Sequence, residues 1–240
     1  MTTAVVVQAR VRSSRLPGKA MLPLGSHTVV EEVLRRCHAI ENVDHVICAI
    51  PDALEDDALI PLVKRAGARL WRGPEADVLA RYRGAAEDVG ADVVMRVTSD
   101  CPLIDPSVCG RVLAARASES ADYACNNMPP TFPHGLDCEA FTIEALRGAD
   151  AEGKTAESRE HVTPWLRQHA DVRRANVTAP GISAADMRWT LDYPEDYEFF
   201  KRLFALLPSP PAIPAWRDVL TVLAANPDIA AINAGRHVTR

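Results

Sequence analysis

Short apolar runs alternate with stretches of helical periodicity through the first 120 residues, and this alternation restricts the possible folds more than any other feature of the chain. The apolar runs at residues 4–7, 46–50, 69–71 and 92–97 predict strands. Apolar residues at helical spacing predict helices over residues 29–38, 59–66, 78–89 and 106–117. Strands that alternate with helices form βαβ units, so we predict an α/β fold with a mainly parallel sheet flanked by helices.

The pattern is weaker after residue 121. Residues 126–135 are rich in turn formers, and long loops of this kind often carry function. Beyond this loop we expect strands at 138–141 and 187–191 and helices at 142–149, 156–169 and 195–207. The prolines between 208 and 214 have the composition of a linker, and a helix at 216–225 and a short apolar segment at 229–232 follow them.

Composition excludes several classes of protein. The chain has 240 residues, of which 48% are hydrophobic, and its net charge of −5 argues against a general nucleic-acid-binding protein. No apolar run approaches the ~20 residues of a membrane span, and no signal-peptide pattern occurs, so we expect a cytoplasmic protein without a membrane partner. The six cysteines are scattered without a C-x-x-C pair, which favours reduced thiols over a disulfide framework or a zinc site.

Four cationic side chains, Arg10, Arg12, Arg15 and Lys19, follow the first strand. Ligands of open α/β sheets bind beyond the carboxyl ends of the strands, and cations clustered there repel one another unless an anion lies among them. One interpretation is a polyphosphate site, in which arginine forks, the lysine and backbone N–H groups bind phosphate oxygens. The alternative is a solvated basic loop. Neither a P-loop string nor the dinucleotide string G-x-G-x-x-G occurs here.

Residues 8–19, QARVRSSRLPGK, closely resemble the nucleotide-binding signature of the cytidylyltransferase family, in which this loop holds the triphosphate of CTP. The family includes the CMP-KDO synthetases and the acylneuraminate cytidylyltransferases, and its spore coat polysaccharide biosynthesis branch is the most similar. The resemblance extends to about Tyr197. It implies a Rossmann-like nucleotide-diphospho-sugar transferase fold over residues 1–207, with an acceptor-binding and dimerisation region at about 122–180, and leaves 208–240 as a linker and helical tail.

Two aspartates follow predicted strands and precede prolines. Asp100 lies in the string RVTSDCPLID and Asp192 in the string RWTLDYPED. Carboxylates at such strand ends are typical ligands of a divalent cation that bridges phosphates. Asp100 can instead form a turn, and Asp192 can instead cap the following helix. Both strings resemble family signatures, which implies that Asp100 and Asp192 bind Mg²⁺.

Three further strings match the branch: GPEADVLARY at 73–82, HGLDCE at 134–139 and SREHVTP at 158–164. The resemblance implies that the first lies near the nucleotide base and that the other two lie near the acceptor. Asp77 can instead be a helix cap, and Arg81 can face either the base or the acceptor. Residues of the other two strings can instead form a dimer contact or a buried polar network.

The resemblance thus implies three sets of site residues, of which the first two share Arg15 and Lys19. The catalytic residues are Arg15, Lys19, Asp100 and Asp192, of which the two aspartates hold the metal. The nucleotide-binding residues are Gln8, Ala9, Arg10, Ser13, Ser14, Arg15, Lys19, Asp77, Arg96 and Ser99. The acceptor-binding residues are Arg81, His134, Asp137, Glu139, Arg159 and His161.

The function implied by these residues is a Mg²⁺-dependent transfer of CMP from CTP to a hydroxyl of an acidic sugar, with release of pyrophosphate. The expected acceptor is a nonulosonic acid or a KDO-like sugar for surface polysaccharide, and the expected assembly is a homodimer. One alternative is a nucleotidyltransferase that acts on a sugar phosphate or another phosphorylated or alcohol acceptor. The other is a nucleotide-binding module without catalysis, which the presence of both aspartates disfavours.

Overall fold

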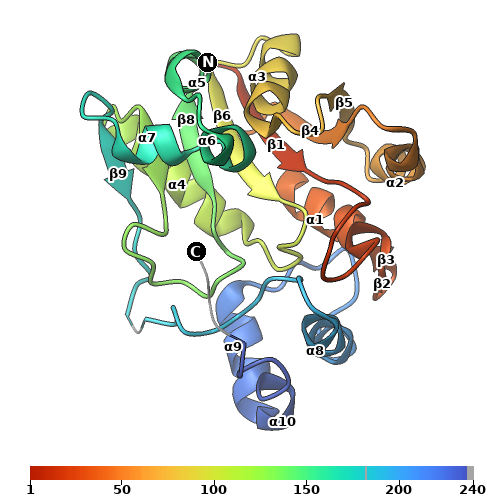
Figure 1. Cartoon of the computed structure of the whole chain (residues 1–240). Coiled ribbons are helices and arrows are strands. Elements are labelled where there is room, and N and C mark those ends of the chain that lie inside the picture. The colour runs from red at the N-terminus through yellow and green to blue at the C-terminus, as the bar shows by residue number, and fades with distance from the viewer. Residues whose placement is uncertain (182, 237–240) are drawn as a thin grey trace.

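The computed structural model describes residues 1–181 and 183–236, which form a seven-stranded sheet flanked by helices (Figure 1). The sheet consists of β1 (Thr3–Gln8), β4 (His45–Pro51), β5 (Arg69–Gly73), β6 (Val93–Thr98), β7 (Tyr123–Cys125), β8 (Glu139–Thr142) and β9 (Arg174–Asn176). Its strand order is β5-β4-β1-β6-β8-β7-β9. Only β8 runs antiparallel to its neighbours among these strands, so the predicted mainly parallel α/β sheet is confirmed.

Helices cover both faces of this sheet (Figure 1). They are α1 (Val29–His38), α2 (Ile60–Arg65), α3 (Val78–Asp88), α4 (Pro106–Ser118), α5 (Ile143–Glu152), α6 (Ala156–His161), α7 (Pro164–Gln168), α8 (Pro194–Phe204), α9 (Trp216–Ala225) and α10 (Pro227–Ala230). Short 3₁₀ turns at Lys19–Met21 and Leu54–Leu59 and a small hairpin of β2 (Pro23–Leu24) and β3 (His27–Thr28) complete the described elements.

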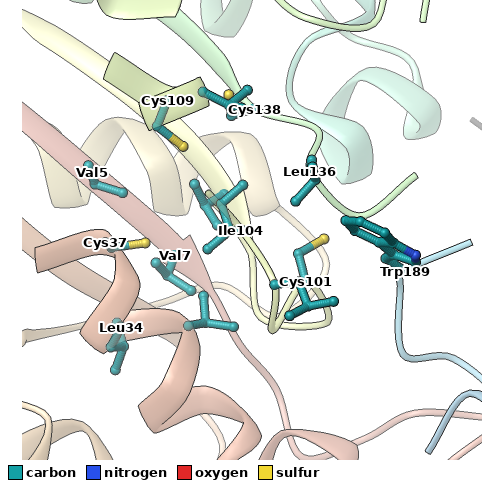
Figure 2. Packing of buried hydrophobic residues seen from close by; sticks show 14 of the residues in the cluster. Val5, Val7, Leu34, Cys37, Cys101, Ile104, Cys109, Leu136, Cys138 and Trp189 are labelled. Carbon is teal, nitrogen blue, oxygen red and sulfur yellow. The ribbon is translucent and has the colours of Figure 1, made fainter. Parts of the chain in front are cut away.

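The alternation of side chains along β1 explains why both faces are apolar. Val5 and Val7 pack with α1, α2 and α4 in one buried cluster (Figure 2), whereas Ala4 and Val6 pack with α3 and α5 in another. A strand covered on both faces carries an uninterrupted apolar run. This is the pattern that the sequence shows at residues 4–7.

Several predicted elements are confirmed and two are wrong. The helices at 29–38 and 216–225 agree with α1 and α9 to the residue. The helix predicted over 156–169 is instead two helices, because Val162 adopts a φ of 70° after α6 and Pro164 begins α7. The strand predicted at 187–191 is an extended segment whose described residues make only one bridge, between Arg188 and His134. The short strands β7 and β9 were not predicted.

The loop 126–137 is joined to segment 187–191 at Gly135, and this contact yields a testable prediction. Gly135 has a φ of 109°, and a Cβ placed there would lie 2.1 Å from the carbonyl oxygen of Trp189. We therefore expect Gly135→Ala to destabilise the fold by about 3 kcal/mol, since steric conflict with backbone adds to the strain of a positive φ. Denaturant unfolding measures this free energy.

The matched control is Gly181→Ala. Gly181 has a φ of 93°, and a Cβ placed there has no neighbour within 4 Å among the described atoms. The control is expected to cost about 1 kcal/mol from backbone strain alone. Equal costs for the two variants would contradict the packing argument.

The C-terminal segment packs onto the main core. The backbone N–H of Trp216 donates to Asp105 Oδ2 at 2.7 Å, and Val219, Leu223 and Ile229 belong to the same buried cluster as β1. Figure 1 shows α9 and α10 beside α8, below the sheet. Of the region 208–240, residues 237–240 lie outside the described part of the chain.

The six cysteines are free thiols, and each is buried. Burial raises the pKa of Cys101 well above that of an ordinary thiol, so this residue is neutral at physiological pH. Within the described residues, no helix is both long enough and apolar enough to cross a bilayer.

Candidate functional site

A cleft of two adjoining lobes lies beyond the carboxyl ends of β1 and β6. From β1 the chain adds β4 and β5 on one side of the sheet and then continues with β6 on the other side. Ligands of open α/β sheets bind at such a switch point, between neighbouring strands whose connections leave in opposite directions. Each lobe has a volume of about 470 Å³. Both lobes are lined by Arg96, Thr98, Asp100, His161 and Asp192, which form their common boundary.

The remaining lining residues give each lobe its character. The lobe that we call basic is completed by Gln8, Arg10, Arg12, Ser13, Ser14, Arg15, Lys19, Ser99 and Glu160. The lobe that we call mixed is completed by Cys101, Asn127, His134, Asp137, Glu139, Glu157, Thr163, Pro164, Arg167 and Thr190. A lobe with an excess of cations therefore adjoins one whose lining combines carboxylates with arginines, histidines and threonines.

Asp100 and Asp192 converge on one point at the boundary between the lobes. The Lys19 ammonium donates to Asp100 Oδ2 at 2.9 Å and to Asp192 Oδ1 at 2.7 Å. The two segments are also joined through the backbone, because the N–H of Leu191 donates to the carbonyl of Asp100 at 2.8 Å. Residues that are far apart in the sequence thus form one charged cluster.

The charges in this cluster stabilise one another. Burial lowers the pKa of Lys19, but Asp100 and Asp192 outweigh this effect and hold the pKa above its ordinary value. Burial conversely raises the pKa of Asp100, and Lys19 and a hydrogen bond from Thr98 outweigh it, so the pKa lies far below its usual range. Arg15 adds a further ion pair to Asp192 Oδ2 at 3.2 Å. Asp100 is therefore ionised at neutral pH.

The two carboxylates fit a hard divalent cation that is shared with a substrate. No group of three or more His, Cys, Asp and Glu side chains in the described residues forms a metal site by itself. Mg²⁺ is commonly held by one or two carboxylates together with phosphate oxygens and water. Because Asp100 and Asp192 reach one ammonium group from two sides, they meet this requirement.

The other cations of the loop also face carboxylates. Arg10 lies 4.0 Å from Glu160, and Arg12 pairs with Glu55 and lies 3.5 Å from Glu75. The loop itself is closed by a hydrogen bond from the N–H of Gly18 to the carbonyl of Val11 at 3.0 Å, and the N–H of Val11 donates to Asp56 at 2.6 Å. The backbone of the loop is thus held in place by these hydrogen bonds. The ion pairs of Arg10 and Arg12 are solvent-exposed, and such pairs contribute little to stability.

Glu139 is the centre of a buried network in the mixed lobe. Its side chain is 3% exposed and accepts hydrogen bonds from Arg96 at 2.7 Å, Tyr123 at 2.5 Å and Thr163 at 2.9 Å. Arg167 lies 3.3 Å from the same carboxylate. Burial raises the pKa of Glu139, and the charges of Arg96 and Arg167 outweigh this effect and hold the pKa below its ordinary value.

Glu139→Gln tests the energetic role of this network. The change leaves two partly buried arginines without their carboxylate, so we expect it to lower the free energy of unfolding at pH 7 by about 3 kcal/mol. Since the folded-state pKa of Glu139 is depressed, its stabilisation is present above the unfolded value of about 4.3 and is lost as the pH falls toward the folded value. The difference between variant and wild type should therefore shrink in acid.

Urea unfolding at pH 7, pH 5 and about pH 3.5 measures that difference across the window. Glu41→Gln, which changes an exposed carboxylate, is the control. A deficit that stayed constant from neutral to acid pH would show that the ionised carboxylate is not what stabilises the network.

His134 and Asp137 form a second polar pair in the mixed lobe. The Nδ1 atom of His134 lies 3.0 Å from Asp137 Oδ2, which also accepts from the N–H of Gly135 at 3.0 Å. His161 lines both lobes from the end of α6. These three residues and Glu139 are thus the members of the predicted acceptor set that the structure brings to one cavity.

Four predicted site residues do not line the cleft. Asp77 caps α3 by accepting from Ala80 N at 2.9 Å and pairs with Arg159, which also lies 2.7 Å from Asp150. These contacts correspond to the cap that was the alternative for Asp77, and they occupy the Arg159 fork. Ala9 is buried in the core.

Arg81 is the fourth of these residues, and its predicted contact with the base or the acceptor stays a prediction. Its side chain is fully buried and donates through Nη1 to the carbonyls of Pro74 and Glu75 at 2.6 and 2.9 Å. It lines neither lobe of the cleft. It clamps the turn between β5 and α3 instead.

Arg167 and Asn127 line the mixed lobe and were missed from the sequence. The Arg167 guanidinium donates to Tyr123 at 3.1 Å and to Asn127 Oδ1. Arg167 stands three residues after the string SREHVTP, which ends at Pro164. It lies on α7, which the predicted helix 156–169 merged with α6. To predict that Arg167 faces the site, one would have needed to predict that the helix breaks at Val162.

Comparisons with known proteins identify the family of this chain. A family model described as cytidylyltransferase matches residues 4–219. The spore coat polysaccharide biosynthesis protein SpsF of Bacillus subtilis is 31% identical over 232 residues, which cover 94% of this chain and 95% of that protein. The 3-deoxy-manno-octulosonate cytidylyltransferase of Alcanivorax borkumensis is 32% identical over 154 residues, 62% of this chain and 53% of its own length.

A solved structure shares the fold over its whole length. It is a cytidylyltransferase from Leptospira borgpetersenii, with a TM-score of 0.91 and 27% sequence identity, and the match covers 100% of both chains.

Proposed function

This chain belongs to the cytidylyltransferase family, and on that premise we propose that it transfers CMP from CTP to a hydroxyl of an acidic sugar and releases pyrophosphate. The observation that carries the proposal is the convergence of Lys19, Asp100 and Asp192 where the basic lobe meets the mixed lobe. A nucleotidyltransferase needs a phosphate site, a metal site and an acceptor site in this order, with the reacting phosphorus between them.

The basic lobe is suited to the triphosphate. Arg10, Arg15 and Lys19 carry the positive charge that stabilises a pyrophosphate leaving group. Lys19 and Arg15 are held by carboxylates, so phosphate oxygens would exchange with those partners. Ser13 and Ser14 line the same lobe and offer hydroxyl groups.

Asp100 and Asp192 would hold Mg²⁺, which when bound neutralises phosphate charge and lowers the pKa of a hydroxyl beside it. The fold contributes the positions of these carboxylates, through the hydrogen bonds of Thr98 to Asp100 and of Leu191 to the Asp100 carbonyl. Positioning and charge stabilisation supply most of the catalysis in phosphoryl transfer, so such fixed groups are sufficient protein machinery.

The mixed lobe is suited to a polyhydroxylated acid. Its carboxylates, hydroxyls and amide would form hydrogen bonds with sugar hydroxyls, and Arg96 and Arg167, which pair with Glu139, are the arginines of this lobe that an acidic group would meet. The names of two relatives refer to spore coat polysaccharide biosynthesis and to 3-deoxy-manno-octulosonate cytidylyl transfer, and both support an acidic sugar of a surface glycan as the acceptor. By family membership we further propose a cytoplasmic homodimer.

A pyrophosphate-release assay tests the proposal. Each of the four nucleoside triphosphates is supplied with Mg²⁺ and a panel of acid sugars, neutral sugars and sugar phosphates. We expect turnover with CTP and an acid sugar only. Turnover with a sugar phosphate in its place would favour the other acceptor class, and CTP binding without turnover on any acceptor would favour a binding module.

A further inference from the structure

The last described residues of the chain return to the segment that carries Asp192. Asn233 follows α10 and is 3% exposed. Its side-chain amide donates to the carbonyl of Arg188 at 3.1 Å and to Asp196 Oδ1 at 3.0 Å. Neither Asn233 nor Asp196 lines the cleft, so this contact lies behind the site. The family match ends at residue 219 and does not include Asn233.

Asp196 links this contact to the cleft. Its carboxylate is fully buried and accepts from the backbone N–H of Asp192 at 2.9 Å and of Tyr193 at 3.0 Å. Arg188 donates to both of its oxygens at 2.9 Å. Burial raises the pKa of Asp196, but the hydrogen bonds from Arg188 and Asn233 outweigh it and keep the pKa below its ordinary value. The carboxylate therefore fixes the backbone from which the Asp192 side chain projects.

A second contact joins the tail to the same segment. The Arg236 guanidinium lies 4.2 Å from the centre of the Tyr193 ring and pairs with Glu195 at 2.7 Å. Arg15, from the basic loop, lies over the same ring at 5.1 Å. The tail thus contacts the two residues on either side of Pro194, and the Tyr193 ring lies between Arg236 and Arg15 of the loop that follows β1.

We propose that the C-terminal tail is part of the nucleotidyltransferase machinery, in which Asn233 acts through Asp196 as a positioning residue for Asp192. This inference rests on the proposed function, because it gives Asp192 a role toward the metal–nucleotide complex. Partners that orient a metal ligand typically contribute 10- to 100-fold to metal affinity or activity. A tail that only covered apolar surface would contribute to stability without this effect.

The test compares Asn233→Ala with Ile229→Ala. Ile229 is 3% exposed in α10 and belongs to the apolar core, so its truncation loosens the tail without removing a contact to Asp196. Asn233→Leu, which keeps the approximate side-chain volume and removes the amide, replaces the alanine variant in this test if that variant folds poorly. Calorimetry measures CTP affinity at a series of Mg²⁺ concentrations, electron paramagnetic resonance measures Mn²⁺ binding with CTP, and thermal unfolding measures stability.

We expect Asn233→Ala to weaken Mn²⁺ binding in the CTP complex about tenfold, with recovery at high metal concentration. Ile229→Ala should lower the melting temperature at least as much and change metal affinity less than about twofold. Equal metal affinities in the two variants would overturn the role of Asn233 but would leave the proposed function standing. A wild-type chain that bound neither CTP nor metal would overturn the proposed function and the inference with it.

Discussion

Replacement of Asp100 or Asp192 by asparagine will lower kcat about 10³-fold, because a metal ion supplies several kcal/mol of charge stabilisation and each 1.36 kcal/mol is a factor of ten. The amide keeps the size of the side chain and a hydrogen-bond acceptor for Lys19, which lies within 2.9 Å of both carboxylates. The fold should therefore persist. Steady-state pyrophosphate release with CTP and Mg²⁺ measures the loss.

The double variant sharpens this prediction. If both carboxylates hold one ion, the loss of either removes most of the metal's contribution, so the double variant should be little worse than each single variant. Asp88→Asn, an exposed carboxylate at the end of α3, is the control and should keep full activity. Retention of more than about a tenth of kcat by either single variant would refute a shared metal site.

Lys19→Met will lower kcat by about 10²- to 10³-fold, the usual loss when one fixed group that stabilises transition-state charge is removed. It will also lower the free energy of unfolding by about 2 kcal/mol, because the ammonium makes charged hydrogen bonds to both Asp100 and Asp192. Two facing carboxylates without a cation repel each other. Lys19→Met is thus expected to lower both the activity and the stability of the protein.

Two measurements identify the cause of the lost stability. Without Lys19, the pKa of Asp100 is no longer held far below its ordinary value, so the variant should lose less stability than wild type as the pH falls. Mg²⁺ alone should raise the melting temperature of the variant more than that of wild type, because the ion can take the place of the ammonium. Lys64→Met, at an exposed position of α2, is the control. Equal responses to Mg²⁺ would contradict this account.

The basic loop and both aspartates could be predicted from the sequence, although the argument for Asp192 was only partly right. Segment 187–191 is not a strand, so Asp192 does not reach the site at a strand end. It arrives there because the N–H of Leu191 donates to the Asp100 carbonyl and Asp196 holds the next turn. The metal role of both residues stays a prediction.

Arg159, Asp77 and Arg81 show the limit of local strings. Each stands in a string that resembles the family, yet Arg159 pairs with Asp77 and Asp150, and Arg81 is buried beneath a turn. A string identifies the type of residue at a position, but a guanidinium can pair with a carboxylate of the scaffold as well as with one of a substrate. Which partner it meets depends on elements distant in the sequence.

The sequence alone determined the α/β class, the order of the first strands and helices, and the cationic loop, because periodicity and strand-end chemistry are local properties. Tertiary structure alone decided the break at Val162 that turns Arg167 into the cleft, the network around Glu139, and the return of Asn233 to the segment of Asp192. These contacts join residues tens of positions apart. Their geometry follows from the packing of whole elements, which no local pattern encodes.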